Sequence, residues 1–482
     1  MTVPRNSAIL LAGSIIPLGV SLVTVPIYIA TIGLDRYGVL LLVWTMIGDF
    51  GFTSLGMGPA VQQGIAALVR GTDAQRSEVY WGGFLATLVA SAVGAALIFG
   101  VAHVYFDKVD ASASLSREIE QAIPIIALLL PISMISNLYH SAILGRERFL
   151  NATVVSTLGA VLQASLPLVA ALLFSQHLIV LMAAAVVART VPALLQTVQS
   201  IWIVPAGRPR LPSRGVFQGV LRFGGWMTLR SIVAPMLKNI ERYFIGASMG
   251  AGAVSLYGVP ANLVSRVALF PDALSRVLFP RFAAHDDSGR SDLESRSIQA
   301  LNALMGPLIL AAAIVIGPFM VLWLGRDLAL RTTPIALILL VGWWGNSFAR
   351  VSNARLDGSG RPDLIPKIML IEAPIYGMLV YFTVALESLT IIALLWSLRA
   401  LFDSGWVLAL TGKLGLVLRQ SWPFGLLILI SVAIGSTTDP FTPWSIGVQA
   451  VLFGLGAVLA WRIAPPQLRD LVLRFLRKRS TA

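Results

Sequence analysis

The sequence predicts an all-α polytopic membrane protein with about fourteen transmembrane helices. Of its 482 residues, 56% are hydrophobic and 12% are charged, whereas a soluble domain carries roughly twice that charged fraction. Apolar runs long enough to cross a bilayer, about 20 residues each, recur from one end of the chain to the other. A chain of this length could otherwise hold two or three soluble domains, but the composition excludes that class.

The expected spans are apolar runs separated by polar, Gly-rich or Pro-containing connections. In order, they cover residues 7–32, 38–69, 80–106, 119–144, 149–174, 178–204, 220–249, 254–279, 301–324, 334–354, 365–386, 389–410, 422–434 and 444–461. The first is expected to be a signal anchor, because it is too long for a cleavable signal. The last two are expected to be shorter than the others. A polar loop, HDDSGRSDLESR, is expected before the ninth span.

Several spans contain prolines, and each proline removes one backbone hydrogen bond and bends its helix. Pro59 is the expected kink of the second span. Bends near Pro26, Pro235 and Pro260 could let parts of the protein rock, or they could be static kinks, which are common in membrane bundles.

The basic residues predict the orientation of the chain. The connections on one side hold twenty-four Lys and Arg residues, and those on the other hold five, which are Arg36, Lys108, Arg117, Arg326 and Arg331. Cytoplasmic loops carry the excess of Lys and Arg. Both termini are therefore expected in the cytoplasm, and the net charge of +13 reflects this topology rather than nucleic-acid binding.

A weak internal repeat predicts two halves. GLDRYGV at 33–39 follows the first span, GAVSLYGV at 252–259 follows the seventh, and each Tyr-Gly-Val opens the next span. Parallel repeats are a recurring transporter plan. The expected organisation is an N-lobe at 1–204, a basic cytoplasmic linker at 205–216, a C-lobe at 217–412, two added helices at 413–462 and a basic amphipathic tail at 463–482.

A cationic stripe marks the seventh span. Arg230, Lys238 and Arg242 are eight and four residues apart, which keeps them within about 120° of one helix face. Charges at membrane depth are costly and usually face a water-filled cavity or a partner. The wider candidate set for binding an anionic substrate adds the remaining membrane-depth cations, namely Arg189, Arg266, Arg350 and Arg399.

Each of these cations could instead pair with a carboxylate. Glu241 is three residues from Lys238, and Asp403 is four residues from Arg399, so these pairs have helical spacing. Asp49 lies inside the second span. It is a candidate proton or cation site together with Glu241, but pairing with an arginine or capping a broken helix is the favoured interpretation of Asp49.

Other chemistry has little support. The chain has no cysteine and only four well-separated histidines, so thiol catalysis and Cys-based metal sites are excluded, and no metal site is predicted. ARLDGSGRPDLI at 354–365 lacks the Lys-Ser/Thr ending of a phosphate loop. It is therefore expected to be a cytoplasmic turn.

Three stretches resemble a known family. NIERYFIGASMG, followed by SLYG and Pro280, resembles the second-lobe signature of polysaccharide (lipid-linked oligosaccharide) flippases, which are the Wzx-like members of the MATE/MurJ (MOP) superfamily. That family usually has Asp-Arg where this chain has Glu241-Arg242. IGDFGFTSLGMG resembles the Asp-x-Gly stretch of the family's second helix, and ARLDGSGRPDLI resembles its turn after the tenth helix.

The resemblance implies a two-lobed helical V and no enzymatic activity. It implies a flippase that moves an undecaprenyl-pyrophosphate-linked oligosaccharide across the bacterial inner membrane by alternating access, for lipopolysaccharide or exopolysaccharide synthesis. The cations would hold the pyrophosphate, and no cofactor is expected apart from coupling to H⁺ or Na⁺. A polysaccharide polymerase and export machinery would be its partners. The two added helices resemble those of the lipid II branch, where they help to form a groove for the lipid tail.

Two alternatives stay open. One is a cation-coupled multidrug exporter of the same fold, which would need an acidic cavity, whereas here the membrane-depth cations outnumber the acids. The other is a membrane enzyme, a polymerase or ligase acting on the same lipid-linked glycan. That class needs a sizeable outer loop, and the longest one, around 107–117, has about a dozen residues.

Overall fold

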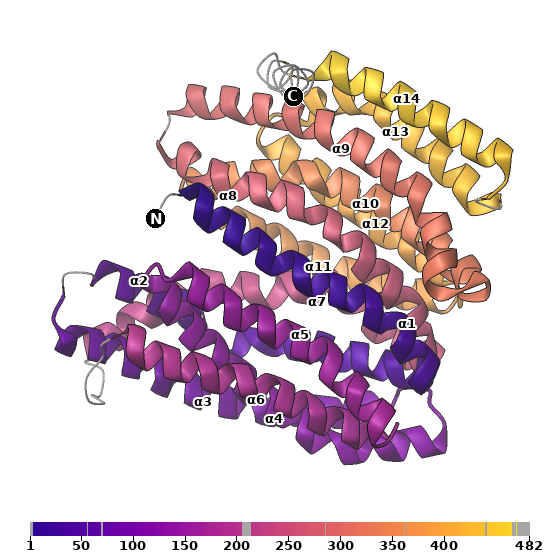
Figure 1. Cartoon of the computed structure of the whole chain (residues 1–482). Coiled ribbons are helices and arrows are strands. Elements are labelled where there is room, and N and C mark those ends of the chain that lie inside the picture. Colours follow the sequence, from indigo (N-terminus) through magenta and orange to yellow (C-terminus); the bar gives the residue numbers. More distant parts are fainter. Residues whose placement is uncertain are drawn as a thin grey trace, which may run out of the picture. The chain divides into compact units, whose positions relative to one another are not determined.

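The computed structural model describes residues 3–54, 56–68, 71–204, 214–284, 286–361, 363–438, 441–464 and 469, with side chains except at 3–12, 14, 214–232, 280, 283 and 284. Over these residues the chain is helical and contains no strand (Figure 1), which confirms the predicted fold class. The helices are α1 (Val3–Asp49), η1 (Phe50–Ser54), α2 (Met57–Ala67), α3 (Asp73–Phe106), α4 (Ala113–Gly145), α5 (Phe149–Leu173), α6 (Leu178–Ile203), α7 (Arg214–Val264), η2 (Ser265–Ala268), α8 (Leu269–Ala284), α9 (Asp287–Leu324), α10 (Arg326–Gly358), α11 (Leu364–Val384), α12 (Leu389–Leu410), α13 (Leu414–Thr437) and α14 (Pro443–Ile463).

Twelve helical segments in the described residues are long and apolar enough to cross a membrane. Two of them, Ile15–Ser54 and Val233–Phe279, have 40 and 47 residues, about twice the length that one crossing needs. Each is interrupted by a glycine with non-helical backbone angles, Gly33 in the first and Gly250 in the second. Counting each as a pair gives fourteen crossings, the predicted number.

The two interruptions share one backbone geometry. Gly33 has φ 81° and ψ 169°, and Gly250 has φ 83° and ψ 168°, a region open almost only to glycine. Each glycine precedes a Tyr-Gly-Val sequence, and each following helix ends in a short 3₁₀ segment, η1 or η2. Gly325, between α9 and α10, has nearly the same angles, φ 83° and ψ 163°, so this geometry alone does not identify the internal repeat.

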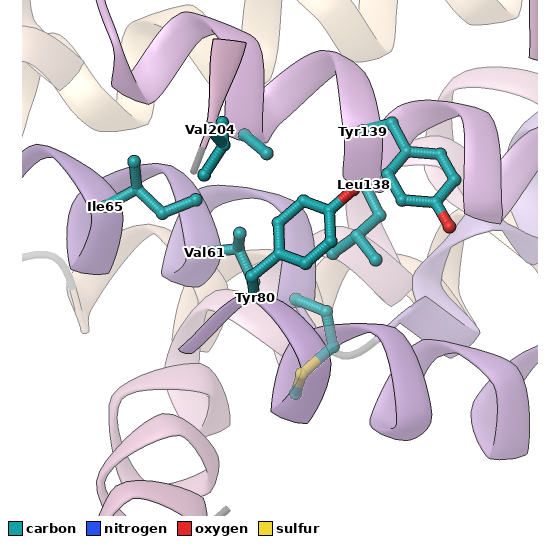
Figure 2. Packing of buried hydrophobic residues seen from close by; sticks show 8 residues of the cluster. Val61, Ile65, Tyr80, Leu138, Tyr139 and Val204 are labelled. Carbon is teal, nitrogen blue, oxygen red and sulfur yellow. The ribbon is translucent and has the colours of Figure 1, made fainter. Parts of the chain in front are cut away.

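The chain divides into two compact units, Met1–Ser255 and Leu256–Ala482. In the first unit, α4 packs against α2, α3 and α6, and α5 packs against both α6 and α1. Figure 2 shows the apolar cluster that joins α2, α3 and α4, in which Val61 lies next to Tyr80 and which also contains Ile65 and Leu138. The Tyr80 hydroxyl lies 2.6 Å from Ser200 Oγ, so this core also fixes the end of α6.

Glu118 joins three helices at the opposite end of the first unit. Its carboxylate lies 2.6 Å from Arg36 Nη2 in α1 and accepts from the backbone N–H of Leu178 at 3.0 Å, in the first turn of α6. His177 Nδ1 lies 3.3 Å away. A carboxylate at a helix N-terminus satisfies an unpaired N–H and complements the helix dipole.

Helices α1 and α7 approach each other closely within the first unit. A Cβ atom added to Gly38 would lie 1.7 Å from the carbonyl oxygen of Ala251, so only glycine allows this contact. The Ser255 hydroxyl donates to the Leu34 carbonyl at 2.6 Å, and the Tyr105 hydroxyl of α3 donates to the Tyr243 carbonyl at 3.0 Å. These contacts hold the segment 233–255 against α1 and α3.

In the second unit, α10 is the most buried helix and contacts α8, α9, α12 and α13. Helix α9 also packs against α13 and α14, and α11 packs against α12. Ser397 and Ser404 of α12 donate to the Ile338 and Gly345 carbonyls of α10, both at 2.8 Å. The lobe boundaries proposed from the sequence stay a prediction.

The predicted polar loop before the ninth span is wrong, because residues from Asp287 onward form the first turns of α9. Asp286 caps this helix by accepting from the Gly289 N–H at 2.9 Å. Glu294 has no exposed surface. It accepts a 2.7 Å hydrogen bond from Ser352 Oγ and pairs with Arg355 of α10. Burial of this charged pair explains how a polar segment becomes helix.

The predicted kink at Pro59 is also misplaced. The helix is interrupted upstream, at η1 and at Gly56, which has φ 70°. Pro59 lies in the first turn of α2, where its missing N–H has no intrahelical partner to lose. The last two spans are longer than expected, since α13 has 24 residues and α14 has 21.

The glycine-rich stretch after α10 is a turn, as predicted. Helix α10 ends at Gly358, Gly360 has φ 79°, and α11 begins at Leu364. Lys367 Nζ lies 2.6 Å from Asp363 Oδ2, and this hydrogen bond lowers the pKa of the exposed Asp363 carboxyl.

Candidate functional site

A polar cluster connects the broken end of α1 to α7 within the first unit. Asp49, 5% exposed, accepts hydrogen bonds from Asn239 Nδ2 and from the Tyr243 hydroxyl, both at 2.8 Å. One turn earlier on α1, Thr45 Oγ1 accepts from Arg242 Nη1 at 3.3 Å. The cluster therefore holds one carboxylate, one guanidinium and three neutral polar groups.

The helical repeat explains why these side chains meet. Thr45 and Asp49 are four residues apart on α1, and Asn239 and Tyr243 are four residues apart on α7, so each pair shares one helix face. Asp49 is the last residue of α1 before η1. The sequence offered two interpretations of Asp49, and the structure shows its carboxylate binding α7.

The predicted stripe on α7 is only partly within the described residues. Lys238 is exposed, Arg242 is half-buried, and Glu241 is 2% exposed. The side chain of Arg230 lies outside the described residues. Lys238 and Glu241 are three residues apart and therefore lie close together on the helix surface, with Glu241 as the buried member of the pair.

Arg189 lies near the middle of α6 in the first unit. Its Nη1 donates to the Ser133 hydroxyl of α4, and its guanidinium lies 5.6 Å from the centre of the Trp44 ring. Among the described residues it makes no ion pair, and its buried Nε has no hydrogen-bond partner. A buried unpaired donor costs about 1–3 kcal/mol, so such a group in a membrane helix is a candidate ligand-binding site.

The second unit holds the remaining cations. Arg350 pairs with Asp272 of α8 at 3.0 Å, and Arg399 pairs with Glu372 of α11 at 2.6 Å. The guanidinium of Arg399 also lies 4.8 Å from the ring centre of Tyr376. Arg266 in η2 is exposed and makes no ion pair among the described residues. Arg350 and Arg399 are therefore matched to acids, the structural alternative considered for each.

Sequence reasoning missed several neutral polar residues. Asn239 and Tyr243 were passed over although they flank the charged pair Glu241-Arg242. On α4, Ser133, Ser136, Asn137 and His140 follow the spacing i, i+3, i+4 and i+7. Polar residues repeated at that spacing within an apolar span indicate a polar helix face, and this signal was present in the sequence.

Comparison with known proteins places the chain in a family. A family model described as "Polysaccharide biosynthesis protein" matches residues 35–329, more than half of the chain. The "Putative O-antigen transporter" of Shigella flexneri is 23% identical over 411 residues, which cover 84% of this chain and 96% of that protein. The "Lipopolysaccharide biosynthesis protein WzxC" of Escherichia coli (strain K12) is 27% identical over 169 residues, 33% of this chain and 34% of that protein.

Solved structures share the fold. The lipid II flippase MurJ, in an inward closed conformation, matches with a TM-score of 0.70 at 11% identity, covering 96% of this chain and 99% of that one. An inward-facing multidrug resistance transporter of the MATE family matches with a TM-score of 0.68 at 13% identity, covering 84% and 99%. The Shigella flexneri relative is named as a transporter, in agreement with the expectation that the chain is not an enzyme. The chain is a multi-pass membrane protein that belongs to the polysaccharide biosynthesis protein family, as a Wzx-like member of the MOP superfamily with the MATE/MurJ fold.

Proposed function

We propose that this protein is a flippase that moves an undecaprenyl-pyrophosphate-linked oligosaccharide from the inner to the outer leaflet of the bacterial cytoplasmic membrane. Family membership, the O-antigen transporter relative and the fold shared with MurJ support the assignment. The flipped glycan would enter surface or exopolysaccharide synthesis, and both termini would lie in the cytoplasm. Alternating access is the mechanism that its repeated architecture supports.

Such a substrate needs a polar path through the membrane. Its pyrophosphate carries negative charge, and its sugars carry many hydroxyls, so neither crosses hydrocarbon without compensation. Arginine and lysine offer charge-assisted hydrogen bonds to phosphate oxygens. We assign this role first to Arg230, Lys238, Arg242 and Arg266, which lie on α7 and η2.

The observation that carries the proposal is the polar stretch Lys238–Tyr243 at membrane depth. Six consecutive residues there include a lysine, a glutamate and an arginine, and Arg242 and Tyr243 are held by Thr45 and Asp49. Charged residues in membrane helices mark substrate or ion pathways by default. Asp49 and Glu241 are proposed as the sites that couple transport to H⁺ or Na⁺.

The lipid tail would lie against the second unit. A cavity of about 430 Å³ is lined by apolar residues of α8, α9 and α14, including Phe270, Leu304 and Trp461, and also by Arg469. An isoprenoid chain is apolar, so it matches this lining. The added helix α14 thus gives the proposed flippase a surface for the tail.

Removal of charge from α7 tests the function. In a strain that lacks the chromosomal copy, we expect Arg230→Ala with Lys238→Ala to abolish surface polysaccharide and to accumulate lipid-linked oligosaccharide in the inner leaflet. The matched control is Lys108→Ala with Arg117→Ala, which removes two positive charges from an outer connection. Immunoblots of membrane fractions verify equal insertion. Normal surface polysaccharide from the α7 variant would refute the proposed role of these cations.

A further inference from the structure

A second polar site lies in the first unit, in a partly open pocket between α4, α5 and α6. Its cavity has a volume of about 370 Å³. The lining residues that can hydrogen-bond or carry charge are Ser133, Ser136, Asn137 and His140 of α4, Ser156 and Gln163 of α5, and Arg189 and Gln196 of α6. Among the described residues no carboxylate lines it, and the guanidinium of Arg189 is the fixed charge in its lining.

Several polar atoms of this cavity are buried without a partner. They are Arg189 Nε, His140 Nδ1 and both amide atoms of Gln163. The Ser136 hydroxyl binds Gln196 Oε1, and the Ser133 hydroxyl binds Arg189 Nη1. Native proteins rarely leave buried polar groups unsatisfied, and here they converge from three helices on one cavity. This convergence indicates a bound polar molecule.

The charge of the cavity restricts the ligand. Arg189 makes no ion pair among the described residues, and a buried guanidinium is strongly stabilised by an oxyanion that accepts two of its hydrogen bonds. The remaining lining is made of amides, hydroxyls and one imidazole, which suit a ring with several hydroxyl groups. The volume lies at the lower end of small-molecule sites, large enough for one sugar ring.

We propose that this cavity binds one acidic sugar ring, such as a uronic acid, with its carboxylate on Arg189 and its hydroxyls on the amides of Gln163 and Asn137. The inference rests on the proposed function, because the acidic ring would belong to the transported glycan. It adds that the protein selects glycans carrying a carboxylate. No residue of α7 lines the cavity within the described chain, and Arg189 also lines a neighbouring cavity of about 410 Å³ that reaches Gly48 of α1.

The absence of cysteine from the chain allows a direct test. Ser156→Cys places a single thiol in the cavity, and Ser156 is a mild choice because its hydroxyl bonds only to the Thr153 carbonyl of its own helix. The purified variant is labelled with a sulfonate-bearing methanethiosulfonate reagent and, separately, with a trimethylammonium-bearing one. Ser114→Cys, exposed in the first turn of α4, is the matched control.

We expect Cys introduced at position 156 to react faster with the anionic reagent than with the cationic one. Arg189→Gln should lower that ratio about tenfold, since a unit charge a few ångströms away acts strongly at low dielectric. Arg189→Lys should keep the preference, and the ratio at the Ser114→Cys thiol should stay unchanged. Glucuronate should protect the thiol at position 156 at lower concentration than acetate, and glucose should not protect it.

Each other result would overturn the inference. If glucose protected the thiol as well as glucuronate does, the site would bind neutral sugars. If acetate protected it as well as glucuronate does, the site would bind carboxylates without recognising a sugar ring. No protection, or an unchanged ratio in Arg189→Gln, would remove Arg189 from ligand binding. These measurements use purified protein and need no transport, so their failure is distinguishable from failure of the flippase assignment, which surface polysaccharide reports.

Discussion

The carboxylate of Asp49, the last residue of α1, accepts hydrogen bonds from two side chains of α7. Its Oδ1 accepts from Asn239 and its Oδ2 accepts from Tyr243, so loss of the side chain leaves two half-buried donors without this acceptor. A carboxylate in this position can hold helices together, and it can also bind a coupling ion. Two substitutions separate these roles.

Asp49→Ala should lower the free energy of unfolding by about 1–3 kcal/mol for each orphaned donor, measured as a fall in Tm in detergent. Asp49→Asn keeps an acceptor and removes the charge, so it should retain most of that stability. The proposed ion coupling expects the folded Asp49→Asn variant to lose polysaccharide export. Equal Tm values for the Ala and Asn variants would contradict the hydrogen-bonding role, and full export by Asp49→Asn would contradict the coupling role.

Among single residues, the charged candidates were predictable and their partners were not. Arg399 has an acid four residues along its own helix, but the contact seen in the structure is to Glu372 of α11. The cavity around Arg189 is built from neutral residues whose spacing on α4 was visible in the sequence. The spacing on α4 alone does not predict a cavity, because the cavity is also lined by Gln163 of α5 and Gln196 of α6.

At the level of helices, the contact between α1 and α7 depends on a missing side chain. Gly38 faces the Ala251 carbonyl so closely that a methyl group would overlap it. Gly48, in the same helix, has no atom within 4 Å of the position that a Cβ would occupy. The two glycines therefore form a matched pair for testing helix packing.

Gly38→Ala should force α1 and α7 apart and destabilise the protein by roughly 1–3 kcal/mol, the cost of overpacking. Gly48→Ala should be neutral or slightly stabilising, because alanine has the higher helix propensity. Thermal unfolding of both purified variants gives the comparison. A Gly38→Ala protein as stable as its Gly48→Ala counterpart would show that the close approach is absent.

Helix boundaries show where apolar patterning is sufficient and where it fails. Spans that are uniformly apolar, such as α5, α6 and α12, were predicted within a residue at each end. The start of α9 was not predicted because its residues are polar. In the structure, this polar segment is helical and Glu294 within it binds Ser352 and Arg355 of α10. The kink was expected at Pro59, whereas the helix is interrupted at η1 and at Gly56, which has φ 70°.

For the whole molecule, the proposed orientation rests on the number of crossings and on the placement of Lys and Arg. An even number of crossings would put both ends of the chain on the same side. The excess of positive charge in one set of connections supports the proposal that this side is cytoplasmic. Family and fold were predictable from the sequence, whereas the cavity inside the first unit required coordinates because it is formed by three helices.

The proposed topology can be tested by labelling single introduced cysteines in intact cells. Ser114→Cys, next to the connection between α3 and α4, should react with a membrane-impermeant maleimide added outside. Ser288→Cys, in the exposed first turn of α9, should react only after the membrane is permeabilised. The unmodified chain gives a background free of thiols. The reverse labelling pattern would invert the topology.

The twin glycines at 33 and 250 also bear on biogenesis. Each one joins two helical segments without any intervening loop, so we expect the two segments to leave the ribosome in immediate succession. At the second glycine, we expect the neighbouring apolar segment to offset the cost of carrying Lys238, Glu241 and Arg242 into hydrocarbon. A charged helix that would be rejected on its own can thus be delivered to the membrane by its neighbour.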